Sequence, residues 1–585
     1  MKTDQYTHPD YYGLDELYSD EHKLVRDAAR AWVKKEVSPI IDDCYEKAVF
    51  PKHLIPGLGE IGAFGPYIPE EYGGPGLDQI SYGIIMQELE RCDSGLRSTA
   101  SVQSSLVMYP IWKYGSEEHK QKFLPKLASG EMVGCFGLTE PDFGSNPGGM
   151  ITNFKEDGDD VILNGAKMWI SNAGYADIFT VFARIEDDKN ITAFIVPNDP
   201  KNGIKLGNEE SKLGIHSSST RQVFFSETKV PVENMISERG NGFKIALNAL
   251  NIGRIKLAAA ALDGERRVTS SAIQYANQRE QFNSKIIEFG AVKEMLVKMA
   301  METYVDESAT YRASKNIEDR ISILKSNGKT HQEAELKGVE EYVVECSILK
   351  VAVSEHLQNC TDLGIQIYGG MGYSTETPME SAWRDARIAR IYEGTNEINR
   401  LLIIGMIIKK ALKGHLNLIE KAEEVANELT EIPSFDVPEF NELFSEEKYL
   451  IQNLKKVFLM LAGAGMKKFG MDLEKEQEVL LRISDIIIEI YMSESAILRT
   501  EKNSTRYGVD KVSSQIAMSK LYLYQACDII ISKAKELIVS LSEGTEQKFL
   551  LAGLKRFTKY FNYPNTIELK RQIADVLEKE NKYPF

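Results

Sequence analysis

The spacing of apolar residues changes twice along this chain, and this change constrains the fold more than any other feature of the sequence. From about Asp20 to Gly134, apolar residues recur at helical spacing. From Cys135 to about Asn241 they form short β-branched and aromatic runs separated by Gly, Asn and Asp. Helical spacing returns at residue 242 and holds to about residue 412. This order predicts a helical unit, a β unit and a second helical unit.

A chain of 585 residues exceeds the size of one hydrophobic core, so we expect several packed units in a fold that is mainly α with a central β domain. The β unit should be a compact antiparallel barrel or sandwich, because its strands are unevenly spaced and no long helices separate them. The predicted segments are an N-terminal α-helical domain (15–134), a middle β domain (135–241), a C-terminal four-helix-bundle domain (242–412), a Glu-rich connector with Pro433 and Pro438 (413–447) and a helical C-terminal extension (448–585).

The net charge of −16 narrows the choice of partners. Nucleic acid and anionic lipid bind non-specifically to clustered Lys and Arg, so neither is expected here. Six cysteines without a C-x-x-C pair and eight dispersed histidines predict no metal site. The stretch from Met1 to Asp10 has no apolar signal-peptide core, and no run approaches 18 apolar residues. These features predict a cytoplasmic protein.

The turn-rich stretch CFGLTEPDFGSNPGG occupies residues 135–149. Stretches of this kind are most often plain connections. The small residues could instead let backbone N–H groups approach a phosphate, with Thr139 and Ser145 adding hydroxyl groups. The residues alone leave both interpretations open.

Two further motifs have the same ambiguity. KMWISN places Trp169 and Ser171 on one face of a predicted strand, where Trp169 either packs in the core or forms a wall for a planar cofactor. ANQREQF places Arg279 and Phe282 at i, i+3 on a predicted helix, where Arg279 forms either a solvated ion pair or a diphosphate clamp. Neither motif is decisive alone.

The most informative stretch is RIARIYEGTNEINRLLIIG, residues 387–405. Helical spacing runs to Tyr392, Gly394 can end that helix, and a second helix should begin near Asn396. Glu393 should then lie at a helix C-terminus, where the helix dipole raises the pKa of a carboxyl group. A raised pKa suits a general base for a weak carbon acid, although an exposed helix-end residue is the commoner case.

The glycines of IYGGMGYSTETP, residues 367–378, follow no predicted strand. They therefore fail the context that a nicotinamide-type dinucleotide loop requires, and we reject a Rossmann interpretation. The sequence also contains no P-loop, H-E-x-x-H or EF-hand pattern.

Taken in order, FGLTEPDFGS, KMWIS, NQREQF, QIYGGMGYSTE and RDARIARIYEGTNEI resemble the acyl-CoA dehydrogenase family over about residues 15–412. The resemblance implies a helical domain, a β domain and a four-helix bundle, with FAD as the cofactor. It also implies an acyl-CoA substrate and an electron-transfer flavoprotein as the electron acceptor. A homo-oligomer, a dimer or a tetramer, is implied because some residues would contact the FAD of a neighbouring subunit.

The resemblance assigns FAD contacts position by position. The loop contributes Phe136, Leu138, Thr139, Gly144 and Ser145; the flavin ring meets Trp169 and Ser171; the diphosphate and adenosine lie near Thr395 and Glu397; and the FAD of a neighbouring subunit meets Arg279, Phe282, Gln366, Gly369 and Gly370. Two residues that follow Arg279 and Phe282 differ from the family's usual pattern. Asn283 stands where Gly is usual, and Gly290 stands where many relatives have Gln. These differences argue against the matching FAD contact.

Glu393 matches the catalytic base in the family's YEGT motif. Some relatives place the base on an earlier helix, at the position that here is Gly253, and glycine cannot act as a base. The implied reaction removes the pro-R α-proton with Glu393 while the β-hydrogen leaves as hydride to flavin N5, giving a trans-2-enoyl-CoA. The positions implied to contact substrate are Ser145, Arg254, Tyr392, Gly394, Arg97 and Ser98.

Residues 448–585 resemble the extension of very-long-chain acyl-CoA dehydrogenases, which are homodimers with a membrane-associated extension. The connector here is acidic and lacks a basic amphipathic face, so we expect no firm membrane attachment. The resemblance of this half favours a medium- or long-chain fatty acyl-CoA, dehydrogenated in fatty acid β-oxidation.

Residues 88–111, ELERCDSGLRSTASVQSSLVMYPI, instead resemble glutaryl-CoA dehydrogenases, in which the residues matching Arg97 and Ser98 hold a distal carboxylate. A buried, unpaired Arg97 would disfavour a long hydrocarbon tail, whereas a solvent-facing Arg97 would not. Decarboxylating dehydrogenation of glutaryl-CoA is therefore the alternative. An acyl-CoA oxidase that uses O2 is less favoured, and a DNA-binding relative is opposed by the net charge and by Glu393.

Overall fold

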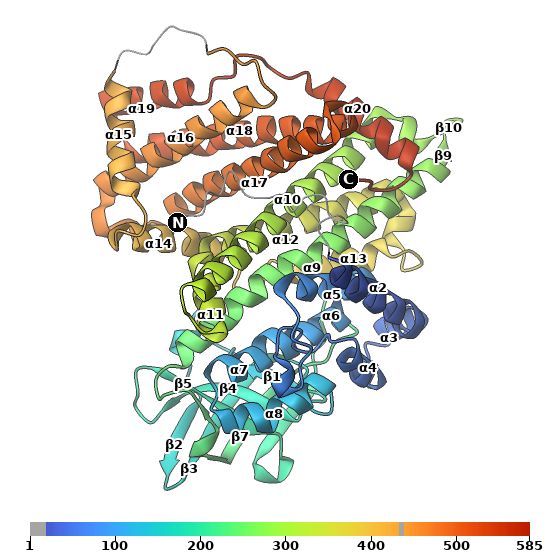
Figure 1. Cartoon of the computed structure of the whole chain (residues 1–585), viewed down its shortest axis with the longest axis vertical. Helices are drawn as coiled ribbons and strands as arrows, with labels where there is room; N and C mark the ends of the chain where they lie inside the picture. The colour runs from blue at the N-terminus through green and yellow to red at the C-terminus, as the bar shows by residue number, and fades with distance from the viewer. Residues whose placement is uncertain (1–18, 432–437) are drawn as a thin grey trace.

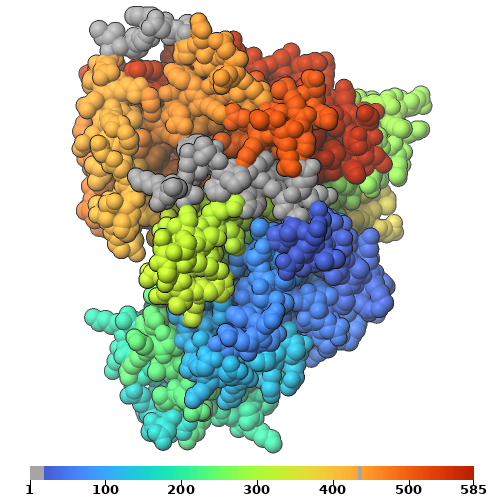
Figure 2. Space-filling view, in the orientation of Figure 1, coloured from blue at the N-terminus to red at the C-terminus, as the bar shows by residue number. Residues whose placement is uncertain are grey.

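A computed structural model describes residues 19–431 and 438–585. The β domain lies at one end of the molecule, the C-terminal extension lies at the other, and the remaining helices lie between them (Figures 1 and 2). The predicted fold class, mainly α with a central β domain and a helical extension, is confirmed. Residues 1–10, the start of the predicted N-terminal domain at 15–18, and Pro433 lie outside the described residues.

The N-terminal part consists of short helices around one long buried helix. Asp78 and Asp93 start two of these helices by accepting backbone N–H groups, over 2.7 Å and 2.6 Å respectively. The long helix α5 is buried along most of its length, so its polar side chains need partners inside the protein. The helices are α2 (Asp20–Trp32), α3 (Ile41–Glu46), α4 (Ile55–Glu60), α5 (Gln79–Cys92), α6 (Ser94–Ser101), α7 (Tyr109–Tyr114) and α8 (Glu117–Ser129), with π-helical turns at Val33–Val37 and Val102–Met108.

The β domain is built on a mixed sheet of order β6-β7-β3-β2-β4-β5-β8, in which β1 also pairs with β4. The expectation of wholly antiparallel pairing is wrong, because β1 and β2 run parallel to β4. Local turn patterns do not reveal which distant strand becomes a neighbour. The strands are β1 (Gly134–Gly137), β2 (Asn153–Asp157), β3 (Asp160–Ser171), β4 (Ile178–Ile185), β5 (Ile191–Pro197), β6 (Ile204–Glu209), β7 (Thr220–Pro231) and β8 (Met235–Ile236).

The central helices form the second helical unit. Helix α9 is the one helix of the described residues that is long and apolar enough to cross a bilayer, but 89% of that apolar window is buried inside the protein. It is therefore a core helix of the bundle. The helices are α9 (Gly242–Gln278), α10 (Gly290–Ser326), α11 (His331–Glu341), α12 (Val343–Tyr368), α13 (Met379–Ile388) and α14 (Asn396–Leu412).

Two expectations about helical segments need correction. Helix α9 ends at Gln278, so Arg279 and Phe282 do not share a helical face. They lie in a hairpin made by β9 (Glu280–Gln281) and β10 (Ser284–Lys285), and Phe282 has φ +55°, which no right-handed helix allows. The predicted connector contains a helix, α15 (Leu418–Thr430), whose exposed face accounts for the Glu-rich composition.

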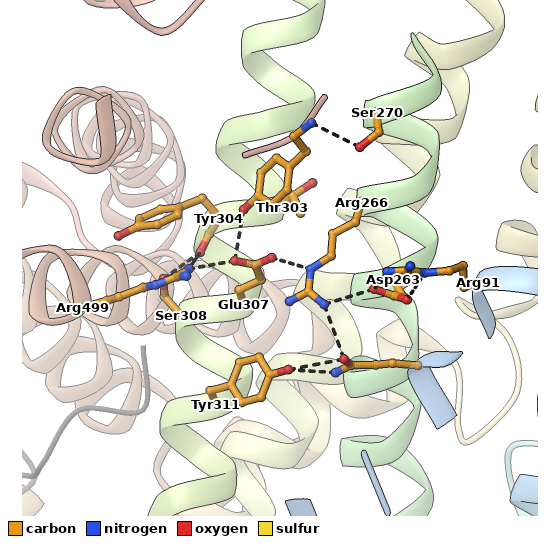
Figure 3. Close-up of polar contacts among 12 residues, drawn as sticks. Arg91, Asp263, Arg266, Ser270, Thr303, Tyr304, Glu307, Ser308, Tyr311 and Arg499 are labelled. Carbon is orange, nitrogen blue, oxygen red and sulfur yellow. Dashed lines mark hydrogen bonds and ion pairs between the residues drawn. The ribbon is translucent and has the colours of Figure 1, made fainter. Parts of the chain in front are cut away.

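The C-terminal extension packs on the bundle and is bonded into its core. Glu307 of α10 accepts hydrogen bonds from Arg266 of α9 over 2.6 Å and from Arg499 of the extension over 2.8 Å (Figure 3). The hydroxyl of Tyr583, near the C-terminus, donates to the same carboxylate over 3.0 Å. The extension helices are α16 (Ser445–Phe469), α17 (Gln477–Tyr507), α18 (Ser513–Leu541), α19 (Gly544–Phe557) and α20 (Thr566–Glu580).

Candidate active site

Glu393 lies in a left-handed turn between two helices, not at the C-terminus of a helix. Helix α13 ends at Ile388, four residues before the predicted end at Tyr392. Glu393 has φ +59° and Gly394 has φ +80°, and two such residues cannot continue a right-handed helix. Helix α14 begins at Asn396 as predicted. The helix dipole is therefore not what sets the pKa of Glu393.

The turn is held by side chains from three helices. Arg254 of α9 donates Nε–H to the carbonyl of Glu393 over 3.2 Å, and Lys350 of α12 donates to the carbonyl of Gly394 over 2.7 Å. Asn399 of α14 donates to the carbonyl of Gly394 over 2.8 Å. A non-glycine residue with positive φ is strained, so these bonds stabilise a conformation that the local sequence disfavours.

The carboxyl group of Glu393 is enclosed, although the residue as a whole is partly exposed. Its Oε2 is buried and has no hydrogen-bond partner among the described residues. Burial raises the pKa of Glu393 to about 7, against the opposing effects of Arg254, Lys350 and Arg97. The sequence predicted a raised pKa, but the cause is desolvation.

Gly253 provides the space that the carboxyl group occupies. A Cβ atom at this position would lie 2.2 Å from Oε2 of Glu393. The glycine therefore lets the carboxyl group pack over α9. A side chain at position 253 and the carboxyl group of Glu393 therefore exclude each other sterically.

Arg97 is buried beside this turn and is paired. Its Nε donates to Glu90 of α5 over 2.5 Å, and its Nη2 donates to the hydroxyl of Tyr392 over 3.0 Å. Burial lowers the pKa of Arg97, but Glu90 and Tyr392 outweigh it, so the net pKa lies above the ordinary value. Ser98 is also buried. Arg97 is thus neither solvent-facing nor unpaired, and Glu90 is a site residue that the motifs did not reveal.

The loop that follows β1 is fixed against β3. The backbone N–H of Met168 donates to the carbonyl of Thr139 over 2.9 Å. Lys167 is fully buried and donates to Glu140 over 2.8 Å and to the carbonyl of Leu138 over 3.2 Å. Glu140 and Lys167 were missed as supports of this loop, and the signal was a pair of opposite charges within two otherwise apolar motifs.

Trp169 lies on the surface next to this loop. A β-bulge interrupts β3 between Lys167 and Ile170, Trp169 has φ +59°, and 53% of its surface is exposed. Packing in the core, one of the two open interpretations, is therefore wrong. Ser171 ends β3, and Gly144 and Ser145 are exposed, as is the loop around them, whereas Phe136 is half-buried.

The two regions assigned to a neighbouring subunit lie together in the fold. Tyr275, near the end of α9, stacks on Tyr368 at the end of α12 with ring centroids 4.0 Å apart. This contact brings the hairpin with Arg279 and Phe282 close to the turn after α12. Phe282 is 89% exposed, and Gln366 in the last turn of α12 and Gly369 and Gly370 in the turn that follows are exposed as well.

Thr395 and Glu397 begin α14. The hydroxyl of Thr395 accepts the backbone N–H of Ile398 over 3.2 Å, and Glu397 is exposed in the first turn. The hydroxyl of Thr395 thus has a structural role as the helix cap. In residues 19–431 and 438–585, no group of three or more His, Cys, Asp or Glu side chains is arranged to hold a metal ion.

Comparisons with known proteins cover the whole architecture. Models of acyl-CoA dehydrogenase domains match residues 19–131 (N-terminal domain), 135–228 (middle domain), 240–408 and 453–556 (both C-terminal domains). The probable acyl-CoA dehydrogenase of Bacillus subtilis is 38% identical over 97% of this chain and 95% of its own length. The very long-chain specific acyl-CoA dehydrogenase of Rattus norvegicus is 32% identical over 89% of this chain and 80% of its own length.

Solved structures give the same picture. The crystal structure of an acyl-CoA dehydrogenase complexed with FAD from Bacillus anthracis has a TM-score of 0.92 and 37% identity, and the match covers 100% of this chain and 98% of that one. Short-chain specific and glutaryl-CoA dehydrogenases also match, but over 67% and 69% of this chain respectively. The C-terminal extension is therefore shared with the relatives from Bacillus subtilis, Rattus norvegicus and Bacillus anthracis.

Proposed function

We propose that this chain, which belongs to the acyl-CoA dehydrogenase family, uses Glu393 to remove the α-proton of a fatty acyl-CoA and so forms the trans-2-enoyl-CoA. The chain is an oxidoreductase of this family. The observation that carries the proposal is the enclosed carboxyl group of Glu393, which lies over Gly253 with Oε2 unpartnered. A general base needs such a free oxygen within an otherwise ordered site.

The pKa of Glu393 matches this role. Because burial raises the pKa to about 7, the carboxyl group is ionised above that pH and is a stronger base than an ordinary glutamate. Proton removal leaves Glu393 neutral, which is the form that its enclosed surroundings favour. The rate of proton removal should therefore fall as the pH drops below about 7.

The surroundings of Trp169 fit the flavin of FAD. An exposed aromatic ring stands beside a loop with exposed Gly144 and Ser145, and the buried Lys167–Glu140 pair fixes that loop. Trp169 and Ser171 would hold the flavin ring, and the glycine-containing loop would approach its phosphates. When bound, FAD supplies the acceptor for the β-hydrogen, which leaves as hydride.

For the substrate we propose a medium- or long-chain acyl group, as part of fatty acid β-oxidation. Arg97 does not require a substrate carboxylate, because Glu90 already neutralises it inside the protein. The relatives that match the extension include a very long-chain specific enzyme. Glutaryl-CoA remains the second candidate, and one observation favours it: Nη1 of Arg97 has no hydrogen-bond partner in the part of the chain that the structure describes.

We further propose a cytoplasmic homodimer or tetramer that passes electrons to an electron-transfer flavoprotein. The exposed Phe282 hairpin and the Gly369–Gly370 turn, adjacent in the fold, would meet the FAD of a second subunit. All six cysteines are free thiols, which suits a reducing compartment.

The test is anaerobic mixing of the purified flavoprotein with butyryl-, octanoyl-, palmitoyl- and glutaryl-CoA while the flavin absorbance is followed. We expect octanoyl- or palmitoyl-CoA to bleach the flavin fastest and to give the enoyl product. Turnover confined to glutaryl-CoA with release of CO2 would select the second candidate. Rapid peroxide formation in air would indicate an oxidase, and a protein unable to take up FAD would contradict the proposal altogether.

A further inference from the structure

Lys350 of α12 is a fully buried lysine whose ammonium group is directed at the catalytic turn. Its Nζ donates to the carbonyl of Gly394 over 2.7 Å and to Oδ1 of Asn396 over 2.7 Å. Both acceptors are neutral oxygens. A buried charge is costly unless an opposite charge lies close to it, so these two hydrogen bonds alone do not account for Lys350.

Two other buried lysines of this protein bond directly to a carboxylate, whereas buried Lys256 donates to the carbonyl of Gln79 over 2.9 Å. Lys113 donates to Glu335 over 2.6 Å, and Lys167 donates to Glu140 over 2.8 Å. Lys350 makes no such ion pair within the described residues. Burial lowers the pKa of Lys350, and the carboxylate that opposes this most strongly is Glu393.

Several other charged groups around the turn are either paired or exposed. On α6, Arg97 is paired with Glu90 of α5. On α12, Glu355 is paired with Arg400 over 2.8 Å, and on α14, Glu397 is exposed.

Arg254 of α9 bonds to Asn251 and to the carbonyl of Glu393, and it has no carboxylate partner within residues 19–431 and 438–585. Glu393 is therefore the carboxylate left for two buried cations, Lys350 and Arg254.

We propose that Lys350 is a positioning residue for the reaction: it holds the left-handed turn at Glu393 and Gly394, and its charge keeps the enclosed carboxyl group of Glu393 ionised. The inference rests on the proposed function, in which Glu393 is the base. Hydrogen bonding acts on the backbone of the turn, and charge acts through space on the carboxyl group.

The anchor of Lys350 is itself rigid. Asn396 donates to Ser354 over 3.1 Å and to Glu355 over 2.9 Å. Arg400, which binds Glu355, also binds Asp485 of the extension over 2.7 Å. The position of Lys350 is thus fixed by α12, α14 and α17 together.

The decisive variant is Lys350→Met, which keeps the length and removes the charge and the donors. Infrared difference spectra between each protein and its Glu393→Gln partner report the protonation of Glu393 at each pH, without substrate. We expect the pKa of Glu393 to rise by about one unit, because the charge of Lys350 lowers that pKa in the native protein. At pH 7, flavin reduction by the best substrate should slow about fivefold, and the pH profile should move upward by the same amount.

Lys350→Gln is the second variant, which keeps an N–H donor for the turn but carries no charge. It should shift the pKa of Glu393 in the same direction, even if Lys350→Met folds poorly. Lys113→Met is the matched control, because it removes a buried lysine that is paired with Glu335 of α11. It should lower stability while leaving the infrared midpoint of Glu393 unchanged.

The inference is overturned if Glu393 titrates at the same pH in wild type and in both Lys350 variants. The proposed function fails in a distinguishable way, since wild-type protein would then not be reduced by any acyl-CoA, whatever the infrared midpoint shows. A midpoint that shifts equally in Lys113→Met would also overturn the inference, because the effect would then reflect general loosening.

Discussion

Glu307 and Glu393 are two enclosed carboxyl groups in the same molecule with opposite surroundings. Both oxygens of Glu307 accept hydrogen bonds, from Arg266, Arg499 and Tyr583 (Figure 3). Glu393 has cations nearby but no direct hydrogen bond to Oε2. Glu307 joins the extension to the bundle, whereas Glu393 lies in a strained turn.

The difference shows what each environment is suited for. A buried carboxylate held by two arginines has no free oxygen for a proton, and its energy depends on all partners being present. A buried carboxylate without a bonded partner has a raised pKa and an oxygen that can accept a proton from a substrate. Burial is common to both groups, so the difference between Glu307 and Glu393 lies in their hydrogen-bond partners.

The largest effect on flavin reduction should come from Glu393→Gln, which removes the carboxylate that we propose as the base. We expect flavin reduction by acyl-CoA to slow by about a thousandfold or more, because a general base contributes about 10²–10⁴-fold. The yellow flavin spectrum should be retained. Glu423→Gln, on the exposed face of α15, is the control and should react at the wild-type rate. Unchanged bleaching in Glu393→Gln would remove this residue as the base.

Glu307→Gln removes the charge of the carboxylate that joins the extension to the bundle. It leaves Arg266 and Arg499 without their shared counter-charge, so we expect a loss of about 3–5 kcal/mol in the free energy of unfolding. Denaturant unfolding followed by circular dichroism measures this loss. Glu546→Gln, which breaks the exposed pair with Lys467, should cost less than about 1 kcal/mol. Equal losses in the two variants would mean that the buried bonds of Glu307 do not stabilise the contact between the bundle and the extension.

Gly253→Ala tests whether the space under Glu393 matters. The added methyl group would lie 2.2 Å from Oε2, so the carboxyl group must move. A displacement of about 1 Å can cost about a hundredfold in rate, and we expect a loss of about 10- to 100-fold in flavin reduction. Gly264→Ala, about three turns further along α9, meets only a flexible leucine at 3.3 Å and should keep most of the activity. Wild-type activity in Gly253→Ala would contradict the packing argument.

The smallest effect should come from Tyr583→Phe. This change removes one hydrogen bond to Glu307 and leaves both arginines in place, so we expect a loss of about 1 kcal/mol in the free energy of unfolding. The exposed Tyr563 provides the matched control, and Tyr563→Phe should have no measurable effect. Flavin reduction should be unchanged in both variants. If Tyr583→Phe cost as much as Glu307→Gln, the hydroxyl of Tyr583 would be the most important partner of Glu307.

The motifs predicted the candidate site residues better than the surrounding structure that positions them. Glu393 and the start of α14 at Asn396 were predicted from a short local pattern, because helix caps depend on neighbouring residues. Arg279 and Phe282 were placed on a helix because the spacing continued past the point where α9 ends. A hairpin of two-residue strands leaves almost no periodic signal.

Trp169 illustrates a different limit. Alternation along β3 predicts which face a residue occupies, but a bulge and a positive φ redirect Trp169 to the surface. The partner of Arg97 was also missed, because Glu90 lies on a separate helix and only the angle between α5 and α6 brings the two charges together.

The sequence by itself determined the order of helical and β units, the family, and Glu393 as the candidate base, because periodicity, caps and motifs are properties of neighbouring residues. Only the tertiary structure decided that burial sets the pKa of Glu393, that Arg97 is neutralised by Glu90, and that Glu307 receives Arg499 from 192 residues away. The physical reason is that desolvation and charge pairing depend on distances in space, and the chain brings such groups together only when it has folded.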